Sequence, residues 1–240
     1  MIRALLAVCG VAASLAASQP LPATRVTTAR ISPDGQWIAF ARQSGAGGAP
    51  LGLFKITIGG QDEQRVAPPD GVISDITWSP KSDAIVYASR SSAGEPGRLR
   101  SVPAAGGSPR SIAPAEAPVS PPRSLTRKDS MVDVRDATVL FVTPVAGDRQ
   151  ALTLSNGKET WIDLASKAGD RVTVMPPGVA RIVAPPSWSA DGKRFAVVAA
   201  PGGDGAGEIF GGFLPLPQPN RPDWVGAAPP MVRQLTGIAR

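Results

Sequence analysis

The chain has 240 residues, of which 25 are Lys or Arg and 19 are Asp or Glu, and its formal net charge is +6. It contains no histidine, which excludes a Ser-His-Asp or Cys-His catalytic system within this sequence, because both need an imidazole base. The basic residues are scattered and are not interleaved with aromatic residues, so no nucleic-acid-binding face is expected. The 26 glycines and 26 prolines lie between apolar stretches, a composition typical of many short strands joined by turns.

The N-terminus has the layout of a signal peptide. Arg3 precedes an apolar run over residues 4–17, and small residues up to Ser18 form a cleavage site. This run of about 14 residues is shorter than the roughly 20 that a membrane-spanning helix needs, and no later stretch approaches that length. We therefore expect a signal peptide at residues 1–18, no transmembrane segment, and a periplasmic or secreted protein.

Removal of residues 1–18 would also remove Cys9, which is the one cysteine of the chain. A lipid-modified cysteine would follow a longer apolar stretch, whereas Cys9 comes only a few residues after Arg3, so we do not expect lipidation. About 222 residues without cysteine or histidine would remain, which leaves no disulfide and no zinc ligand of these types. We expect no metal and no cofactor.

One pattern returns three times along the chain, at residues 31–41, 76–88 and 187–198. The first copy carries Ser-Pro-Asp-Gly at residues 32–35, and Ser79 of the second copy lies 47 residues after Ser32. Proline presets φ, aspartate bonds back onto its own backbone, and glycine accepts a positive φ. Each copy therefore predicts two strands joined by a tight turn.

The run after the first turn alternates Ile38 and Phe40 with Ala39 and Ala41. This period of two is that of a β-strand with large side chains on one face and small ones on the other. Small residues allow a neighbouring sheet to approach closely. Further strands are expected at residues 53–56, 64–66, 98–102, 110–112, 139–142, 161–164, 171–174 and 233–236.

Four strands in a repeat of about 45 residues are typical of a β-propeller blade. We therefore expect an all-β fold over residues 19–240, a β-propeller of four-stranded blades. About 222 residues divided by this period give close to five blades, with a range of about 4–6. The pattern is weak over about 113–158, where we expect degenerate or loop-rich sequence. The ring could be incomplete, with unpaired strand edges on open terminal blades.

The Ser-Pro-Asp-Gly hairpins, with a tryptophan before the turn at Trp78 and Trp188, resemble the WD-like repeats of the TolB propeller. They are also similar to the N-terminal propeller of prolyl oligopeptidase-family peptidases. The first resemblance implies a further N-terminal α/β domain, and the second implies an α/β-hydrolase domain. We expect neither, since residues 19–28 alone separate the signal peptide from the first hairpin and the sequence stops at Arg240. The resemblance specifies fold well and function poorly.

No catalytic, cofactor-binding or metal-binding residue is expected. Ser155 and Lys158 match the Ser-x-x-Lys motif of penicillin-binding enzymes, but the Asn-Gly between them is a hairpin signal. Asp34 and Asp191 are interpreted as turn residues. Trp78 and Trp188 are interpreted as packing groups between blades.

Four residues are candidates for partner contact. Trp224 lies in a proline-rich segment outside the repeats, where its ring could contact a partner or pack locally. Arg123, Arg127 and Lys128 could dock an acidic partner, although a solvated loop is the simpler interpretation.

These observations favour an exported β-propeller that acts as a protein- or ligand-binding scaffold in the cell envelope, TolB-like and not an enzyme. The alternative is the propeller portion of a prolyl oligopeptidase- or dipeptidyl peptidase-like serine peptidase without its hydrolase domain. A third option is a propeller enzyme that uses carboxylates only, which would need paired acids at the channel mouth.

Overall fold

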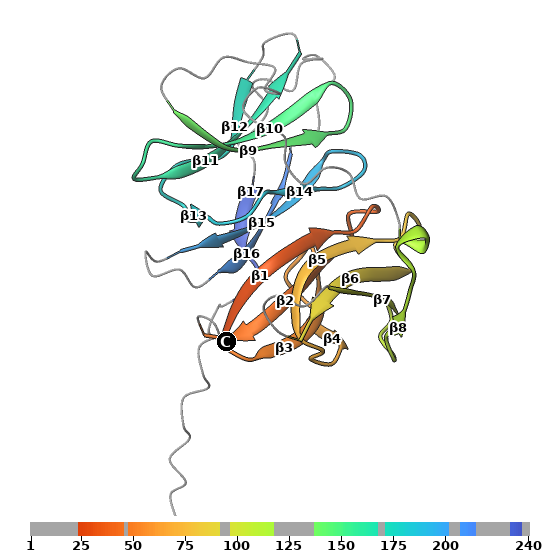
Figure 1. Ribbon diagram of the computed structural model, residues 1–240. Helices are drawn as coiled ribbons and strands as arrows, with labels where there is room; N and C mark the ends of the chain where they lie inside the picture. Colours follow the sequence, from red (N-terminus) through yellow and green to blue (C-terminus); the bar gives the residue numbers. More distant parts are fainter. Residues whose placement is uncertain are drawn as a thin grey trace, which may run out of the picture.

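The computed structural model describes residues 24–45, 48–91, 97–117, 137–167, 171–201, 207–214 and 231–236. These residues form four antiparallel sheets, three with four strands and one with five, and neighbouring strands follow the order of the chain except that β13 and β14 both pair with β15 (Figure 1). The expected all-β fold of four-stranded propeller blades is confirmed, and the four blades lie within the expected range. Residues 1–18, Cys9, Arg123, Arg127, Lys128 and Trp224 lie outside the described residues.

The strands are assigned to blades as follows. The first blade contains β1 (Thr24–Ile31), β2 (Trp37–Ser44), β3 (Pro50–Thr57) and β4 (Gln64–Ala67). The second contains β5 (Val72–Trp78), β6 (Ala84–Arg90), β7 (Arg98–Pro103) and β8 (Arg110–Ser111), followed by the short 3-10 helix η1 (Pro114–Glu116). The third contains β9 (Thr138–Val145), β10 (Arg149–Ser155), β11 (Thr160–Ser166) and β12 (Arg171–Met175). In the fourth, β13 (Arg181–Ile182) and β14 (Ser187–Trp188) both pair with β15 (Arg194–Ala200), and β16 (Glu208–Phe213) and β17 (Met231–Gln234) follow.

The hairpin turns are held by the side chains that the sequence singled out. In the first blade, Asp34 Oδ1 accepts hydrogen bonds from the Ser32 hydroxyl and from the Gln36 N–H, at 2.5 and 3.0 Å. Gly35 adopts a φ of 69°, which a side chain would disfavour. In the fourth blade, Asp191 Oδ1 accepts from the Ser189 hydroxyl at 2.5 Å. The turn interpretation of both aspartates is confirmed.

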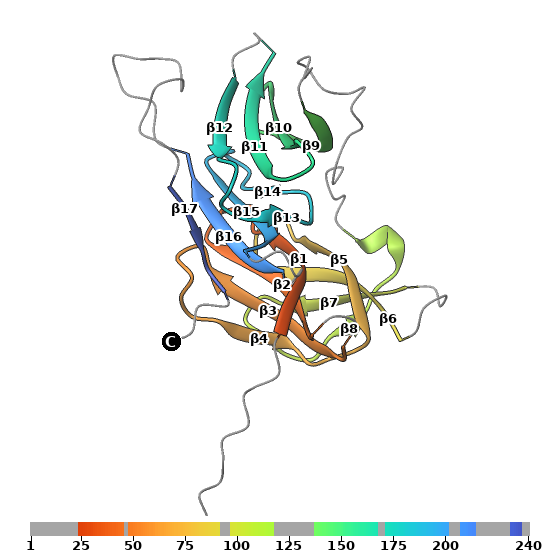
Figure 2. The same cartoon turned by 90° about the vertical axis from the view of Figure 1, so that its left-hand side faces the viewer.

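The hydrophobic clusters give the spatial order of the blades. One cluster joins the first and fourth blades, a second joins the first and second, and a third joins the third and fourth. Among the described residues no cluster joins the second and third blades. Figures 1 and 2 show these two blades at opposite ends of the stack. Among the described residues, the blades therefore follow one another in the order second, first, fourth and third.

The first and fourth blades pack against each other, whereas the sequence left open whether these blades would expose unpaired strand edges. Strand β1 packs against β14, β15 and β16, so the last blade covers the first. Ile38 and Phe40 of the first blade are fully buried in the cluster that also contains Val198 and Ile209 of the fourth. The terminal blades stay together because each presents a row of large apolar side chains to the other.

Hydrogen bonds reinforce the contact between the first and fourth blades along its length. At the hairpin end, the Ala190 N–H donates to the Pro33 carbonyl at 3.2 Å, and the Arg194 guanidinium donates to the Gly35 carbonyl at 3.0 Å. At the other end, the Val26 N–H donates to the carbonyl of Gly207 at 2.7 Å. The two sheets are therefore fixed in rotation as well as in separation.

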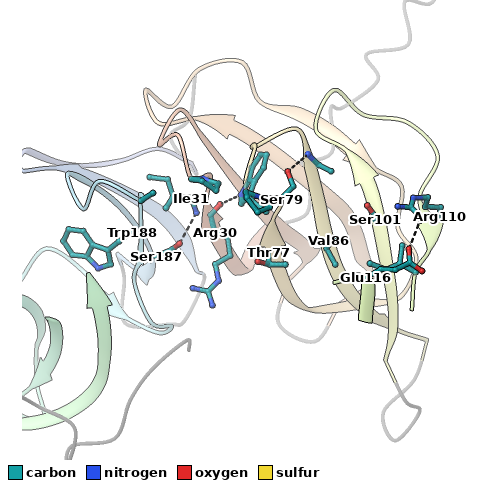
Figure 3. Close-up of a pocket in the computed structure, with 16 residues that line it drawn as sticks. Arg30, Ile31, Thr77, Ser79, Val86, Ser101, Arg110, Glu116, Ser187 and Trp188 are labelled. Atoms are coloured by element: carbon teal, nitrogen blue, oxygen red, sulfur yellow. Dashed lines mark hydrogen bonds and ion pairs between the residues drawn. The ribbon is translucent and has the colours of Figure 1, made fainter. Parts of the chain in front are cut away.

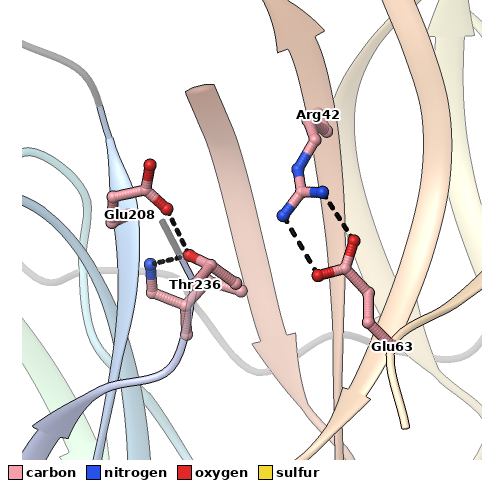
Figure 4. A network of polar contacts seen from close by, with 5 residues as sticks. Arg42, Glu63, Glu208 and Thr236 are labelled. Atoms are coloured by element: carbon pink, nitrogen blue, oxygen red, sulfur yellow. Dashed lines mark hydrogen bonds and ion pairs between the residues drawn. The ribbon is translucent and has the colours of Figure 1, made fainter. Parts of the chain in front are cut away.

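Polar groups of the two blades also face each other across this interface (Figure 4). In the fourth blade, the Thr236 hydroxyl donates to the Glu208 carboxylate and accepts from the Ile209 N–H. Opposite it, Arg42 and Glu63 of the first blade form an ion pair of 2.5 Å. Burial raises the pKa of Glu208, and the Glu63 carboxylate adds to this shift, while the Thr236 hydroxyl and the Arg42 guanidinium oppose it.

Substitution of Ile209 by alanine tests the contact between the terminal blades. Ile209 is fully buried, so Ile209→Ala should lower the free energy of unfolding by about 2–5 kcal/mol. Urea denaturation followed by circular dichroism measures this loss. Met231→Ala is the control, because that side chain is 74% exposed and its removal should change stability little. Equal midpoints for both variants would contradict the assignment of this interface.

Glu208 gives a pH-dependent prediction. Its pKa in the folded chain lies above the ordinary value of 4.5, so above pH 4.5 the folded state keeps a proton that the unfolded state has lost. The free energy of unfolding contributed by this group therefore falls as the pH rises through that window. Glu208→Gln should lose less stability than the wild type between about pH 4 and about pH 7. Urea titrations at each pH test this, with the exposed Glu159→Gln as control; parallel losses in wild type and Glu208→Gln would refute it.

Candidate functional site

A cavity with a volume of about 700 Å³ lies between three blades (Figure 3). Its floor is the face of the second blade that points away from the first, and its side is formed by residues of the first and fourth blades beside their hairpins. The lining consists of Arg30, Ile31, Pro33, Thr77, Trp78, Ser79, Pro80, Ala84, Val86, Ser101, Arg110, Ile112, Glu116, Ser187, Trp188 and Ala190.

The strand register explains how one face of the second blade supplies this floor. Thr77 pairs with Val86 and Val86 pairs with Ser101, which in turn pairs with Arg110. Paired residues in an antiparallel sheet project to the same side. A row of four side chains, one from each strand, therefore crosses the floor of the cavity from the inner strand β5 to the outer strand β8.

The polar groups of this row can all donate hydrogen bonds, and the two hydroxyls can also accept them. Within the described part of the chain, the hydroxyls of Thr77 and Ser101 have no hydrogen-bond partner. Arg110 forms an ion pair with Glu116 at 3.4 Å, in which the two side chains are 69% and 53% exposed. Such an exposed pair contributes little stability, about 0–1 kcal/mol, so the Arg110 guanidinium can take another partner at low cost.

Arg30 marks the opposite end of the cavity. Figure 3 shows its side chain between Ser187 of the fourth blade and Thr77 of the second. The Ser187 hydroxyl accepts a hydrogen bond from the Ile31 N–H at 3.1 Å, which fixes the fourth blade against β1 at this point. A guanidinium therefore stands at each end of the row.

The two tryptophans of the repeats have packing roles. Trp78 is 5% exposed within the cluster of the first and second blades, and its indole N–H donates to the Arg30 carbonyl at 3.0 Å. Trp188 packs on Phe195 with ring centroids 5.0 Å apart. The packing interpretation is confirmed for Trp78, which joins two blades. Trp188 additionally lines the cavity.

The other motifs take the structural roles expected of them. Ser155, Asn156 and Lys158 lie in the β10–β11 hairpin, where the Asn156 side chain accepts from the Lys158 N–H at 3.0 Å.

No group of three or more His, Cys, Asp or Glu side chains that could hold a metal occurs in the part of the chain that the structure describes. No helix formed by these residues is long and apolar enough to cross a membrane.

The sequence did not predict the cavity or its lining. The four candidates for partner contact, Trp224, Arg123, Arg127 and Lys128, lie outside the described residues, and the cavity is formed by residues that the sequence placed in ordinary strands and turns. Its signal was the small and polar residues Ala84, Ser101 and Thr77, each of which is next in sequence to a buried apolar side chain. That signal also fits a tightly packed blade interface.

Solved structures that the chain resembles include members of both families named from its hairpins. A putative TolB from Agrobacterium tumefaciens has 15% identity and a TM-score of 0.29, over 79% of this chain and 58% of that chain. TolB from Acinetobacter baumannii has 15% identity and a TM-score of 0.28, over 77% and 40%. Prolyl oligopeptidase B from Galerina marginata has 12% identity and a TM-score of 0.40, over 89% and 42%.

The chain thus spans between 40% and 58% of the length of these proteins. Likenesses at this level carry no information on activity or partner. No protein-family model matches the chain, and no curated protein sequence matches it.

Substitution of Trp78 tests the hydrogen bond that links the second blade to the wall of the cavity. Trp78→Phe keeps an aromatic ring in the cluster but removes the indole N–H that donates to the Arg30 carbonyl, which should cost about 0.5–1.5 kcal/mol of unfolding free energy. Trp188→Phe is the matched control, because the indole N–H of Trp188 is buried without a partner among the described residues. Urea denaturation of both variants measures the difference, and a smaller loss for Trp78→Phe would overturn the role of this bond.

Proposed function

We propose that the chain is an exported β-propeller scaffold that binds an extended segment of a partner protein in the cavity on the second blade. The observation that carries this proposal is the 700 Å³ cavity on a sheet face that no hydrophobic cluster of the described residues joins to another blade. Binding cavities in proteins are concave and mostly apolar, with a few placed polar groups. The lining combines the apolar side chains of Ile31, Val86 and Ile112 with the polar groups of Thr77, Ser101 and Arg110.

The length of the floor favours an extended segment over a small ligand. Four strands spaced about 4.8 Å apart span about 14 Å, and an extended chain advances about 3.3 Å per residue. About four residues of a partner could therefore lie across the row, with apolar side chains on Val86 and Ile112. Polar groups at both ends would fix the direction of the segment.

The proposal also includes that the chain is exported from the cytoplasm and that it binds its partner without hydrolysing it. The signal peptide expected at residues 1–18 would direct the chain to the periplasm or outside the cell. The lack of histidine removes the base of the known serine and cysteine triads. A binding role uses the features that the chain does have, which are a rigid stack of blades and an open cavity.

Selection from a random-peptide phage library tests this function. The wild type should enrich peptides with a shared motif, and Thr77→Trp, which fills the cavity without a change of charge, should enrich none of them. Ala84→Trp fills the same cavity from β6 and replaces Thr77→Trp in the test if Thr77→Trp does not fold. Melting curves followed by circular dichroism show whether each variant is folded.

Val179→Trp is the matched control, since Val179 is 37% exposed and does not line the cavity. It should select the wild-type motif. Recovery of that motif on both cavity-filling variants, or no enrichment on the wild type, would overturn the proposal.

A further inference from the structure

We infer that the segment bound in this cavity is acidic, an extended peptide whose carboxylates face Arg30 and Arg110. This inference rests on the proposed function and specifies the chemistry of its partner. It is carried by the polar groups of the cavity wall and by their distribution along the row.

The charged side chains of the wall are two arginines and one carboxylate. Arg30 and Arg110 carry guanidinium groups, which donate hydrogen bonds and accept none. The hydroxyls of Thr77 and Ser101 lie between them and have no partner among the described residues. Glu116 is the one carboxylate of the lining. A ligand with carboxylate and carbonyl oxygens fits such a wall, whereas a cationic ligand would leave two arginines against its charge.

The two arginines stand at opposite ends of the row, Arg30 on the inner strand β1 of the first blade and Arg110 on the outer strand β8 of the second. A single small anion could reach one of them but not bridge the about 14 Å between the inner and outer strands. An extended peptide with two separated carboxylates can contact both. Guanidinium–carboxylate contacts are charge-assisted and stronger than neutral hydrogen bonds.

Glu116 lowers the affinity of the cavity for an acidic peptide in this arrangement. It holds Arg110 through an exposed ion pair of 3.4 Å, and a bound carboxylate would have to displace it and then lie near its negative charge. Removal of that charge should therefore strengthen the binding of an acidic peptide. The direction of this change distinguishes a ligand-binding arginine from one that serves only the local fold.

Fluorescence anisotropy with labelled random-decapeptide pools tests the inference. One pool contains Glu and Asp among small and apolar residues, a second contains Lys and Arg instead, and a third contains neither. The wild type should bind the acidic pool about tenfold more tightly than the neutral pool, the value of one charge-assisted contact. The preference should decrease as salt increases.

Four variants complete the experiment, with thermal melts to confirm that each is folded. Arg30→Gln and Arg110→Gln should each lose several-fold in affinity for the acidic pool, and Glu116→Gln should gain several-fold. Arg181→Gln is the matched control, because Arg181 is exposed and lies outside the cavity lining; it should bind as the wild type does.

The outcomes separate the inference from the function on which it rests. Equal binding of the acidic and neutral pools, or a preference for the basic pool, would overturn the inference while Thr77→Trp still abolishes binding. A Glu116→Gln variant that binds the acidic pool more weakly would also overturn it. Failure of all three pools to bind the wild type would count against the proposed function itself.

Discussion

The packing of the fourth blade on the first determines the arrangement of the other two. The facing sheets bury the large side chains of one against the other, among them Phe40 and Ile209, and burial of this kind is the main stabilising term in a chain without disulfides in its described part. Backbone hydrogen bonds between Ala190 and Pro33 and between Val26 and Gly207 fix the orientation of this interface. The second and third blades then extend from its two sides.

The cavity is a consequence of this order. In the first blade, Ala39 and Ala41 are 0% and 4% exposed because the second blade covers them. Val86 and Ala88 hold the equivalent positions on β6, but no cluster of the described residues joins their face to a further blade. The same repeat position is thus a packing position in one blade and a cavity wall in the next.

Much of the fold was predictable because its signals are local. The Ser-Pro-Asp-Gly turn closes through bonds between residues a few positions apart, as at Ser32 and Asp34, and the alternation of Ile38 and Phe40 with Ala39 and Ala41 already separates the two faces of β2. The third blade was harder to predict because the turn between β9 and β10 lacks the Ser-Pro-Asp-Gly motif. Its strands β9 and β10 lie within the range for which degenerate sequence was expected.

The sequence by itself determined the all-β class, the four-stranded repeat and the turn chemistry, since each depends on residue type and short-range spacing. The tertiary structure alone decided that the first and fourth blades pack together, that no hydrophobic cluster of the described residues joins the second and third blades, and that Arg30, Thr77, Ser101 and Arg110 line one cavity. These features depend on which sheet faces meet. Residues with the same alternating pattern can face a neighbouring blade or solvent, and only contacts between distant parts of the chain distinguish the two.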